Sequence, residues 1–188
     1  MKKIIYLIFI LVISACSWRS PNSEFYMMNS KGLSPLSDKV INVAVAKVKV
    51  PDLLDRSQMV VYDPDSHQVN ILEFNRWGEV FPDVLQNTVI NDLIAYMPRA
   101  YIKRTYFDSA YAQYSLNIEI NNFEAYKGEK VVLSAWWNVV NSKGKIILKK
   151  QGTYTTQVAG SSIKDLVDAQ IQAVHLLSKE IAEQLLKL

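Results

Sequence analysis

Two stretches of the chain repeat apolar residues with the spacing of an α-helix. The first covers residues 80–97, where apolar side chains recur every three or four positions, and Pro98 then ends the pattern. The second covers 162–187, and its Ser162 and Asp165 resemble the capping box found where helices begin. Each stripe gives a helix one apolar face, so we predict two principal amphipathic helices.

The other apolar segments have the spacing or the composition of β-strands. Strict alternation over 114–121 predicts a half-exposed strand, whereas 40–50 is apolar on both faces at its centre and predicts a covered strand. Further strands are expected at 25–29, 59–62, 69–74, 131–140 and 146–158. The loop before 146–158 has Gly144 where a hairpin needs positive φ. The predicted fold class is α+β, with one mainly antiparallel β-sheet packed by the two helices.

The start of the chain reads as an export signal that ends at the only cysteine. Two lysines precede ten apolar or aromatic residues at 4–13, which is the length of a signal-peptide core and about half of a membrane span. Ser14 and Ala15 are small enough for a lipoprotein signal peptidase to reach the backbone. We predict a lipoprotein signal peptide over 1–15, and N-acyl and S-diacylglycerol groups on Cys16. The alternatives are a plain signal peptide with a chance cysteine after the cut, and a core cysteine near an apolar end.

Removal of this signal leaves 188 − 15 = 173 residues, which suits one domain with a substantial core. Residues 16–24 are polar and turn-rich, so we expect the lipidated N-terminus and a tether there, followed by a single periplasmic α+β domain at 25–188. Eight extended residues span at most about 29 Å, so the tether would keep the domain near the bilayer. Ser17 rather than Asp follows the cysteine, which favours sorting to the outer membrane in a Gram-negative cell.

Composition and motifs argue against several classes of function. Without its two signal lysines the chain has 21 − 2 = 19 basic and 18 acidic residues, so it has no basic excess for nucleic acid. His67 and His175 are isolated in the sequence, and the cysteine lies outside the fold, so we expect no metal site. A serine-nucleophile elbow and a phosphate-binding glycine loop are both absent from the sequence. We therefore expect no catalytic residue, no cofactor beyond the acyl groups, and no enzyme.

Two segments carry a family resemblance, VPDLLDRSQMVVY at 50–62 and EFNRWGE at 73–79. They closely resemble the PqiC-like ABC-type transport auxiliary lipoproteins, outer-membrane lipoproteins that serve the paraquat-inducible MCE system. The matching residues are Leu54, Asp55, Arg56, Gln58, Met59, Val60, Arg76, Trp77 and Glu79. Three departures are that Ser57 replaces the family's usual proline, Gly78 its alanine, and Val80-Phe81 its proline-leucine pair.

The resemblance implies a lipoprotein on the periplasmic face of the outer membrane that assembles into a homo-oligomeric ring. Its partner would be an MCE-domain protein that carries phospholipid or other lipids across the envelope. The implied function is that of a non-enzymatic accessory or docking protein. The main alternative is a lipid-binding or outer-membrane assembly lipoprotein that holds an apolar ligand in its own cavity. An envelope hydrolase is a third reading, and it lacks a nucleophile and a base.

The candidate partner-binding residues come from the two matching segments. They are Asp55, Arg56, Gln58, Arg76 and Trp77. Loop segments often carry binding residues, and arginine and tryptophan are enriched at partner contacts. The structural alternatives are that Asp55 and Arg56 pair with each other or cap a turn, and that Trp77 fills the core.

Replacement of the predicted acylated residue tests the anchor. Cys16→Ser is expected to release the protein from membranes, or to trap it with its signal attached, because no other segment is long and apolar enough to hold it. Membrane fractionation and the mass of the mature protein measure both results, with Ser17→Ala as the control. Normal cleavage and unchanged recovery of Cys16→Ser in outer membranes would contradict the lipoprotein prediction.

Overall fold

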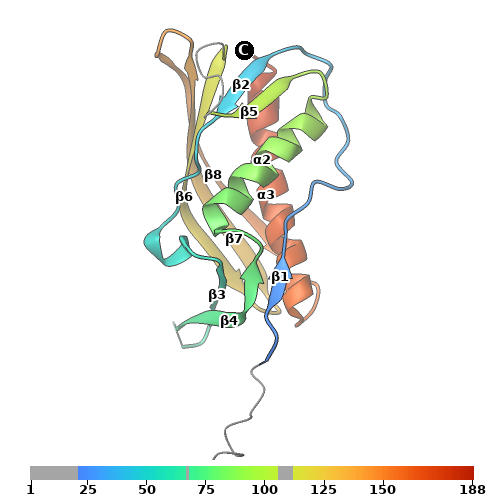
Figure 1. The fold of residues 1–188 in the computed structure, drawn as a ribbon, viewed down its shortest axis with the longest axis vertical. Helices are drawn as coiled ribbons and strands as arrows, with labels where there is room; N and C mark the ends of the chain where they lie inside the picture. Colours follow the sequence, from blue (N-terminus) through green and yellow to red (C-terminus); the bar gives the residue numbers. More distant parts are fainter. Residues whose placement is uncertain (1–20, 67, 106–111) are drawn as a thin grey trace, which may run out of the picture.

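The computed structural model describes residues 21–66, 68–105 and 112–188 (Figure 1). Cys16, the predicted lipid attachment site, and His67 lie outside the described residues. None of the described helices is both long enough and apolar enough to cross a bilayer.

The described elements are eight strands, two α-helices and one short 3-10 helix. In order they are β1 (Glu24–Tyr26), β2 (Asn42–Val45), the short 3-10 helix η1 (Asp52–Leu54), β3 (Gln58–Tyr62), β4 (Val69–Trp77), α2 (Phe81–Tyr96), β5 (Tyr101–Arg104), β6 (Tyr114–Tyr126), β7 (Lys130–Asn141), β8 (Ile146–Gln157) and α3 (Ile163–Leu185). The eight strands form one mixed sheet. The predicted α+β class, with two principal helices and a mainly antiparallel sheet, is confirmed.

An antiparallel meander of β6, β7 and β8 forms the long part of the sheet. Gly128 and Gly144 turn the chain between these strands with φ values of 75° and 76°, a conformation that glycine adopts without a steric penalty. The other edge of β6 pairs in parallel with β2 at its start and with β3 at its end. β5 extends the sheet beyond β2, and β4 and β1 extend it beyond β3.

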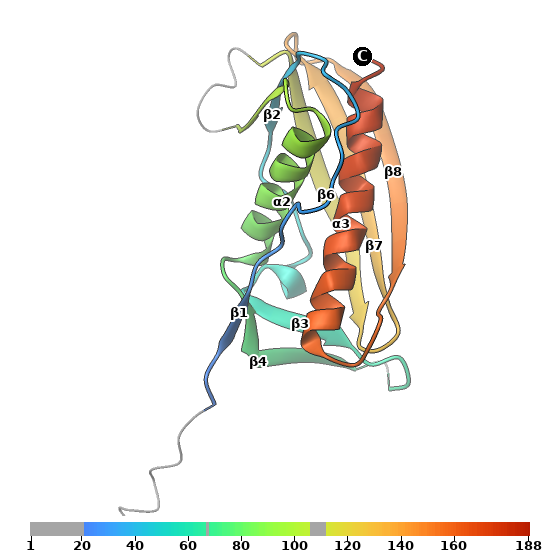
Figure 2. The same cartoon turned by 90° about the vertical axis from the view of Figure 1, so that its right-hand side faces the viewer.

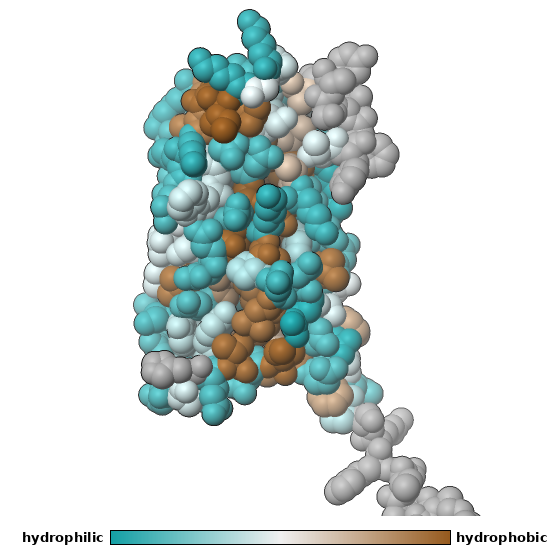
Figure 3. Space-filling model, turned by 90° about the vertical axis from the view of Figure 1, so that its left-hand side faces the viewer, coloured by the Kyte–Doolittle hydropathy of each residue, from teal (hydrophilic) through white to brown (hydrophobic). Residues whose placement is uncertain are grey.

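Both helices lie against the same face of the sheet (Figure 2). Alternation along β7 sends Ala135 and Trp137 into the core, where both are almost fully buried, and sends Trp136 and Asn138 to the opposite face. Neither helix covers that opposite face, which carries many hydrophilic side chains (Figure 3). The described chain is therefore two-layered, with one sheet face left open.

The start and the packing of α3 follow from a few polar contacts. The capping box predicted at Ser162 and Asp165 is present, because each residue's backbone N–H donates to the other's side chain at 3.1 Å. The Ser162 hydroxyl donates to the Asp165 carboxylate at 2.6 Å, and this bond, together with the one from the Ser162 N–H, lowers the pKa of Asp165. On β8, the Tyr154 hydroxyl donates to Glu180 of α3 at 2.6 Å, and burial together with this bond raises the pKa of Tyr154. This hydrogen bond joins β8 to α3.

His175 joins the two helices. Its Nδ1 lies 2.8 Å from an Asp92 carboxylate oxygen, and Asp92 on α2 is completely buried. The imidazole is half-buried. In this position His175 gives one oxygen of a buried carboxylate a partner, while the other oxygen, Oδ1, lacks one among the described residues.

Two strand predictions need correction, and one strand was not predicted. The strand expected over 40–50 ends at Val45, and the segment beyond it follows β6 through a single bridge between Lys49 and Glu119. The first strand is Glu24–Tyr26 rather than 25–29. Strand β5 was not predicted, because four residues directly after a helix carry too little periodicity to be recognised.

Candidate functional site

The structure brings the two family-like segments together. The backbone N–H of Trp77 donates to the Ser57 carbonyl at 2.7 Å, and that of Phe81 donates to the Arg56 carbonyl at 3.1 Å. The second bond satisfies a backbone N–H at the start of α2, which has no side-chain cap. We call residues 54–58 together with 76–81 the motif junction.

Trp77 lies beneath the motif junction in the core. It is 3% exposed and stacks on Phe81 with 5.4 Å between ring centroids, and Phe81 in turn stacks on Phe123 of β6 at 5.2 Å. Such stacked pairs add to the stabilisation that comes from burial alone. Trp77 therefore fills the core in this structure, and its ring is not available at the surface.

Arg76 braces a bend in β4. Gln58 of β3 pairs with Arg76, whereas the next residue of β3 pairs with Leu72, so residues 73–75 form a bulge. Arg76 closes that bulge, because its Nε donates to the Glu73 carbonyl at 2.8 Å and its Nη2 donates to the Glu73 carboxylate at 2.6 Å. Its described contacts are local ones that fix the shape of the strand.

Asp55, Arg56 and Gln58 lie nearer to the surface than Trp77 does. Asp55 is exposed and ends η1, and within the described residues no ion pair joins it to Arg56. Arg56 is half-buried, and its Nε is buried without a hydrogen-bond partner. Gln58 is half-buried and lines a small hollow of about 10 Å³ that Gln170 also lines. Among the five candidate partner-binding residues, Arg56 is the one whose charged side chain has a buried N–H donor, Nε, without a hydrogen-bond acceptor.

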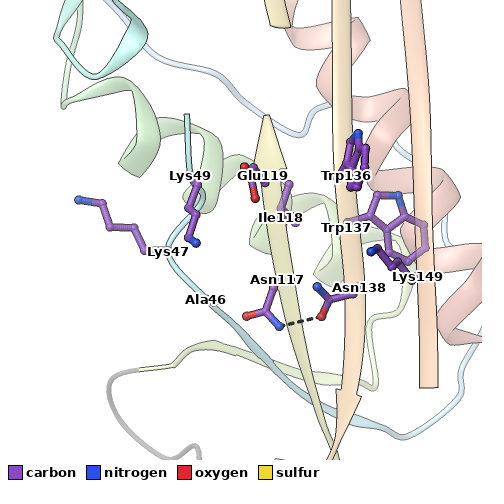
Figure 4. Close-up of a pocket in the computed structure, with 10 residues that line it drawn as sticks. All are labelled: Ala46, Lys47, Lys49, Asn117, Ile118, Glu119, Trp136, Trp137, Asn138 and Lys149. Carbon is purple, nitrogen blue, oxygen red and sulfur yellow. Dashed lines mark hydrogen bonds between the residues drawn. The ribbon is translucent and has the colours of Figure 1, made fainter. Parts of the chain in front are cut away.

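A larger hollow lies on the open face of the sheet. Its volume is about 350 Å³, and Figure 4 shows Asn117 and Asn138 joined across its floor, with Trp136 and Lys149 on one side and Lys49 on the other. A second hollow of about 390 Å³ shares Lys47 and Lys49 and reaches Asp55 and Pro82. We call the surface formed by Lys47, Lys49, Asn117, Trp136, Asn138 and Lys149 the lysine groove.

The chemistry of the lysine groove favours an acidic ligand. Three lysines and one glutamate, Glu119, line the 350 Å³ hollow. Lys149 Nζ lies 5.3 Å from the centroid of the Trp136 ring, which is a cation–π distance, and Trp136 is 44% exposed. Exposed tryptophan is enriched at contact surfaces. The groove has no serine or cysteine among its lining residues, and in the described ranges no cluster of His, Cys, Asp and Glu could hold a metal ion.

Sequence reasoning missed the lysine groove because its residues come from four separate segments: the stretch after β2, and strands β6, β7 and β8. The alternation over 114–121 does place Asn117 and Glu119 on the outer face, and that was the available signal. Nothing in the sequence shows that Lys47 and Lys149 lie at the same hollow, since that depends on how β2, β6 and β8 are ordered in the sheet.

Comparisons with known proteins agree with this fold. Residues 29–182 match the profile of a family described as the ABC-type transport auxiliary lipoprotein component. The crystal structure of an uncharacterised protein superposes with a TM-score of 0.72 at 22% identity, covering 88% of this chain and 99% of that one. A protein of Xanthomonas campestris has a TM-score of 0.69 at 14% identity, with 84% and 92% covered. No curated protein matches the chain.

One buried and one exposed tryptophan allow a matched stability test. Trp77→Ala is expected to lower the free energy of unfolding by roughly 3–5 kcal/mol, because it removes a buried ring from the stack with Phe81. Trp136→Ala removes an exposed ring, so its effect is expected to be within about 0.5 kcal/mol. Chemical denaturation measures both changes. Equal losses for the two variants would contradict the described placement of Trp77.

Proposed function

The chain belongs to the ABC-type transport auxiliary lipoprotein family, and on that premise we propose that it is a non-enzymatic docking protein of an intermembrane lipid-transport system. In this proposal acyl groups on Cys16 anchor it to the periplasmic face of the outer membrane. Its partner is an MCE-domain protein that carries phospholipid across the envelope. The chain supplies a fixed position and a contact surface, and the transport path lies in the partner.

The filled core is the observation that supports docking over the carriage of a lipid. A protein that holds an acyl chain needs a deep apolar cavity, because ligand sites of this kind are concave and mostly apolar. Beside Trp77 the described core leaves about 10 Å³, which is about the room that one water molecule needs. The two larger hollows are open to solvent and are lined partly by lysine and asparagine. The described residues therefore favour a docking protein over a protein that holds an apolar ligand in its own cavity.

We assign the partner contact to the exposed side of the motif junction and to the adjoining lysine groove. Asp55 belongs to the motif junction and also lines the hollow that Lys47 and Lys49 share, so the two surfaces are continuous. In this arrangement Asp55 and Arg56 contact the partner directly. Gln58, Arg76 and Trp77 hold the segment in shape from within or beside it.

Self-association into a ring is part of the proposal. A small domain held near a bilayer gains avidity for an elongated partner when several copies bind it together. Among the described strands β8 pairs with β7 alone, so one edge of a 12-residue strand is unpaired. Free strand edges are common sites of pairing between chains, and this edge is the supporting feature for contact between copies.

Recovery of the partner from envelope membranes tests the docking function. The acylated protein, carrying a C-terminal affinity tag, is cross-linked in cells and purified, and co-purified proteins are identified by mass spectrometry. Arg56→Ala is expected to lower recovery of the MCE-domain protein by about tenfold, because it removes a charged hot-spot residue. Arg99→Ala removes an exposed arginine after α2 and is the control.

The outcomes separate the assignment from the function. Normal recovery with Arg56→Ala at an unchanged melting temperature would contradict the assignment of Arg56. Unfolding of Arg56→Ala with normal recovery per folded molecule would show that its loop is structural. Failure of the unaltered protein to recover any MCE-domain protein would contradict the docking function itself.

A further inference from the structure

Large apolar side chains are exposed at the end of the molecule where the described chain begins. Phe25 is 67% exposed and Met27 is 51% exposed, although both are large apolar residues in or beside a strand. Phe74, in the β4 bulge near β1, is 41% exposed. Figures 1 and 2 show β1 and β4 at this end, with the chain leading away from β1. We call Phe25, Met27 and Phe74 the apolar end surface.

Local hydrogen bonds fix the direction in which β1 presents these side chains. Tyr26 donates its hydroxyl to Glu24 at 2.5 Å, and Asn75 Nδ2 donates to the same carboxylate at 3.2 Å, so these residues share one side of the strand pair. The hydrogen bond to Glu24 and burial raise the pKa of Tyr26, so this hydroxyl remains a donor. Phe25 alternates to the other side, beside Arg76.

Met27 is fitted against the backbone next to this surface. Its Sδ occupies the space above Gly78, where an added Cβ would lie 2.5 Å from the sulfur. The N–H of Gly78 also donates to the Tyr26 carbonyl at 2.9 Å. The glycine thus allows the segment after β1 to lie close to the end of β4 with its methionine still half-exposed.

From this surface we infer that the apolar end contacts the lipid bilayer directly, so that the domain rests on the membrane in a fixed orientation. The inference depends on the proposed acylation of Cys16. Glu24 is the eighth residue after Cys16, and even a fully extended chain of that length spans at most about 29 Å. The start of β1, with the exposed rings beside it, therefore lies within about 29 Å of the lipid anchor.

The charges around the surface favour a zwitterionic lipid surface. The nearest carboxylates, Glu24 and Glu73, each accept hydrogen bonds from neighbouring side chains. The tip between β3 and β4 carries Asp63 and Asp65, which would be repelled by anionic headgroups. Burial of apolar rings in the interfacial region is then the attractive contribution. Vesicles of phosphatidylethanolamine and phosphatidylcholine are the suitable probe.

A fluorescent label at one introduced cysteine at a time measures the contact between the apolar end surface and lipid. Cys16 is the only cysteine and has no free thiol when acylated, so an introduced cysteine takes up an environment-sensitive fluorophore alone. Labels at Phe25→Cys and Phe74→Cys are compared with one at Ser142→Cys, in the β7–β8 turn at the other end of the sheet (Figure 1). The full acylated protein is reconstituted in the vesicles, and quenching by spin-labelled lipids is measured.

The expected result is a blue-shifted emission at positions 25 and 74 that spin-labelled lipid quenches several-fold more strongly than at 142. Equal, solvent-like emission at all three positions, with protein that floats with the vesicles and has the mass of the acylated form, would overturn the inference and leave the anchor intact. A shift that appears without lipid and grows with protein concentration would assign the surface to a second copy and also overturn it. An intact mass without acyl groups would overturn both the anchor and the inference.

Discussion

The ring stack that runs from Trp77 through Phe81 to Phe123 is the contact on which the rest of the structure depends. It joins the end of β4, the first residue of α2 and the longest strand of the sheet. The same two residues, Trp77 and Phe81, donate their backbone N–H groups to the 56–57 segment. The family-like residues therefore have a packing role: they form the connection at which β3 and β4 lead into α2.

The two faces of the sheet differ in what they expose. With both helices on one side, the apolar core lies between them and the sheet, and the hollow beside Trp77 measures about 10 Å³, too little for an acyl chain. The other side keeps Trp136 and three lysines in reach of a partner. A filled core and an open, charged surface are the features of a protein that acts by contact, which is why we propose docking rather than carriage.

Much of the fold could be predicted from local signals, and much of the candidate site could not. The stripe in 162–187 and its Ser162 cap follow from helix periodicity and a local hydrogen-bond pattern, which do not depend on the rest of the chain. The parallel pairing of β2 with β6, by contrast, joins segments far apart in sequence and has no local signature. The same limit applies to Arg76, because its bond to Glu73 arises from a bulge that only the register of β3 and β4 creates. Lys47 and Lys149 likewise become neighbours of one hollow only after the sheet is assembled.

Native mass spectrometry of the acylated protein purified from envelopes distinguishes docking of a transporter from carriage of lipid by the protein itself. For docking we expect the mass of the mature chain plus the covalent acyl groups on Cys16, with no further lipid at stoichiometric occupancy. One phospholipid bound non-covalently per chain, lost on unfolding, would contradict it.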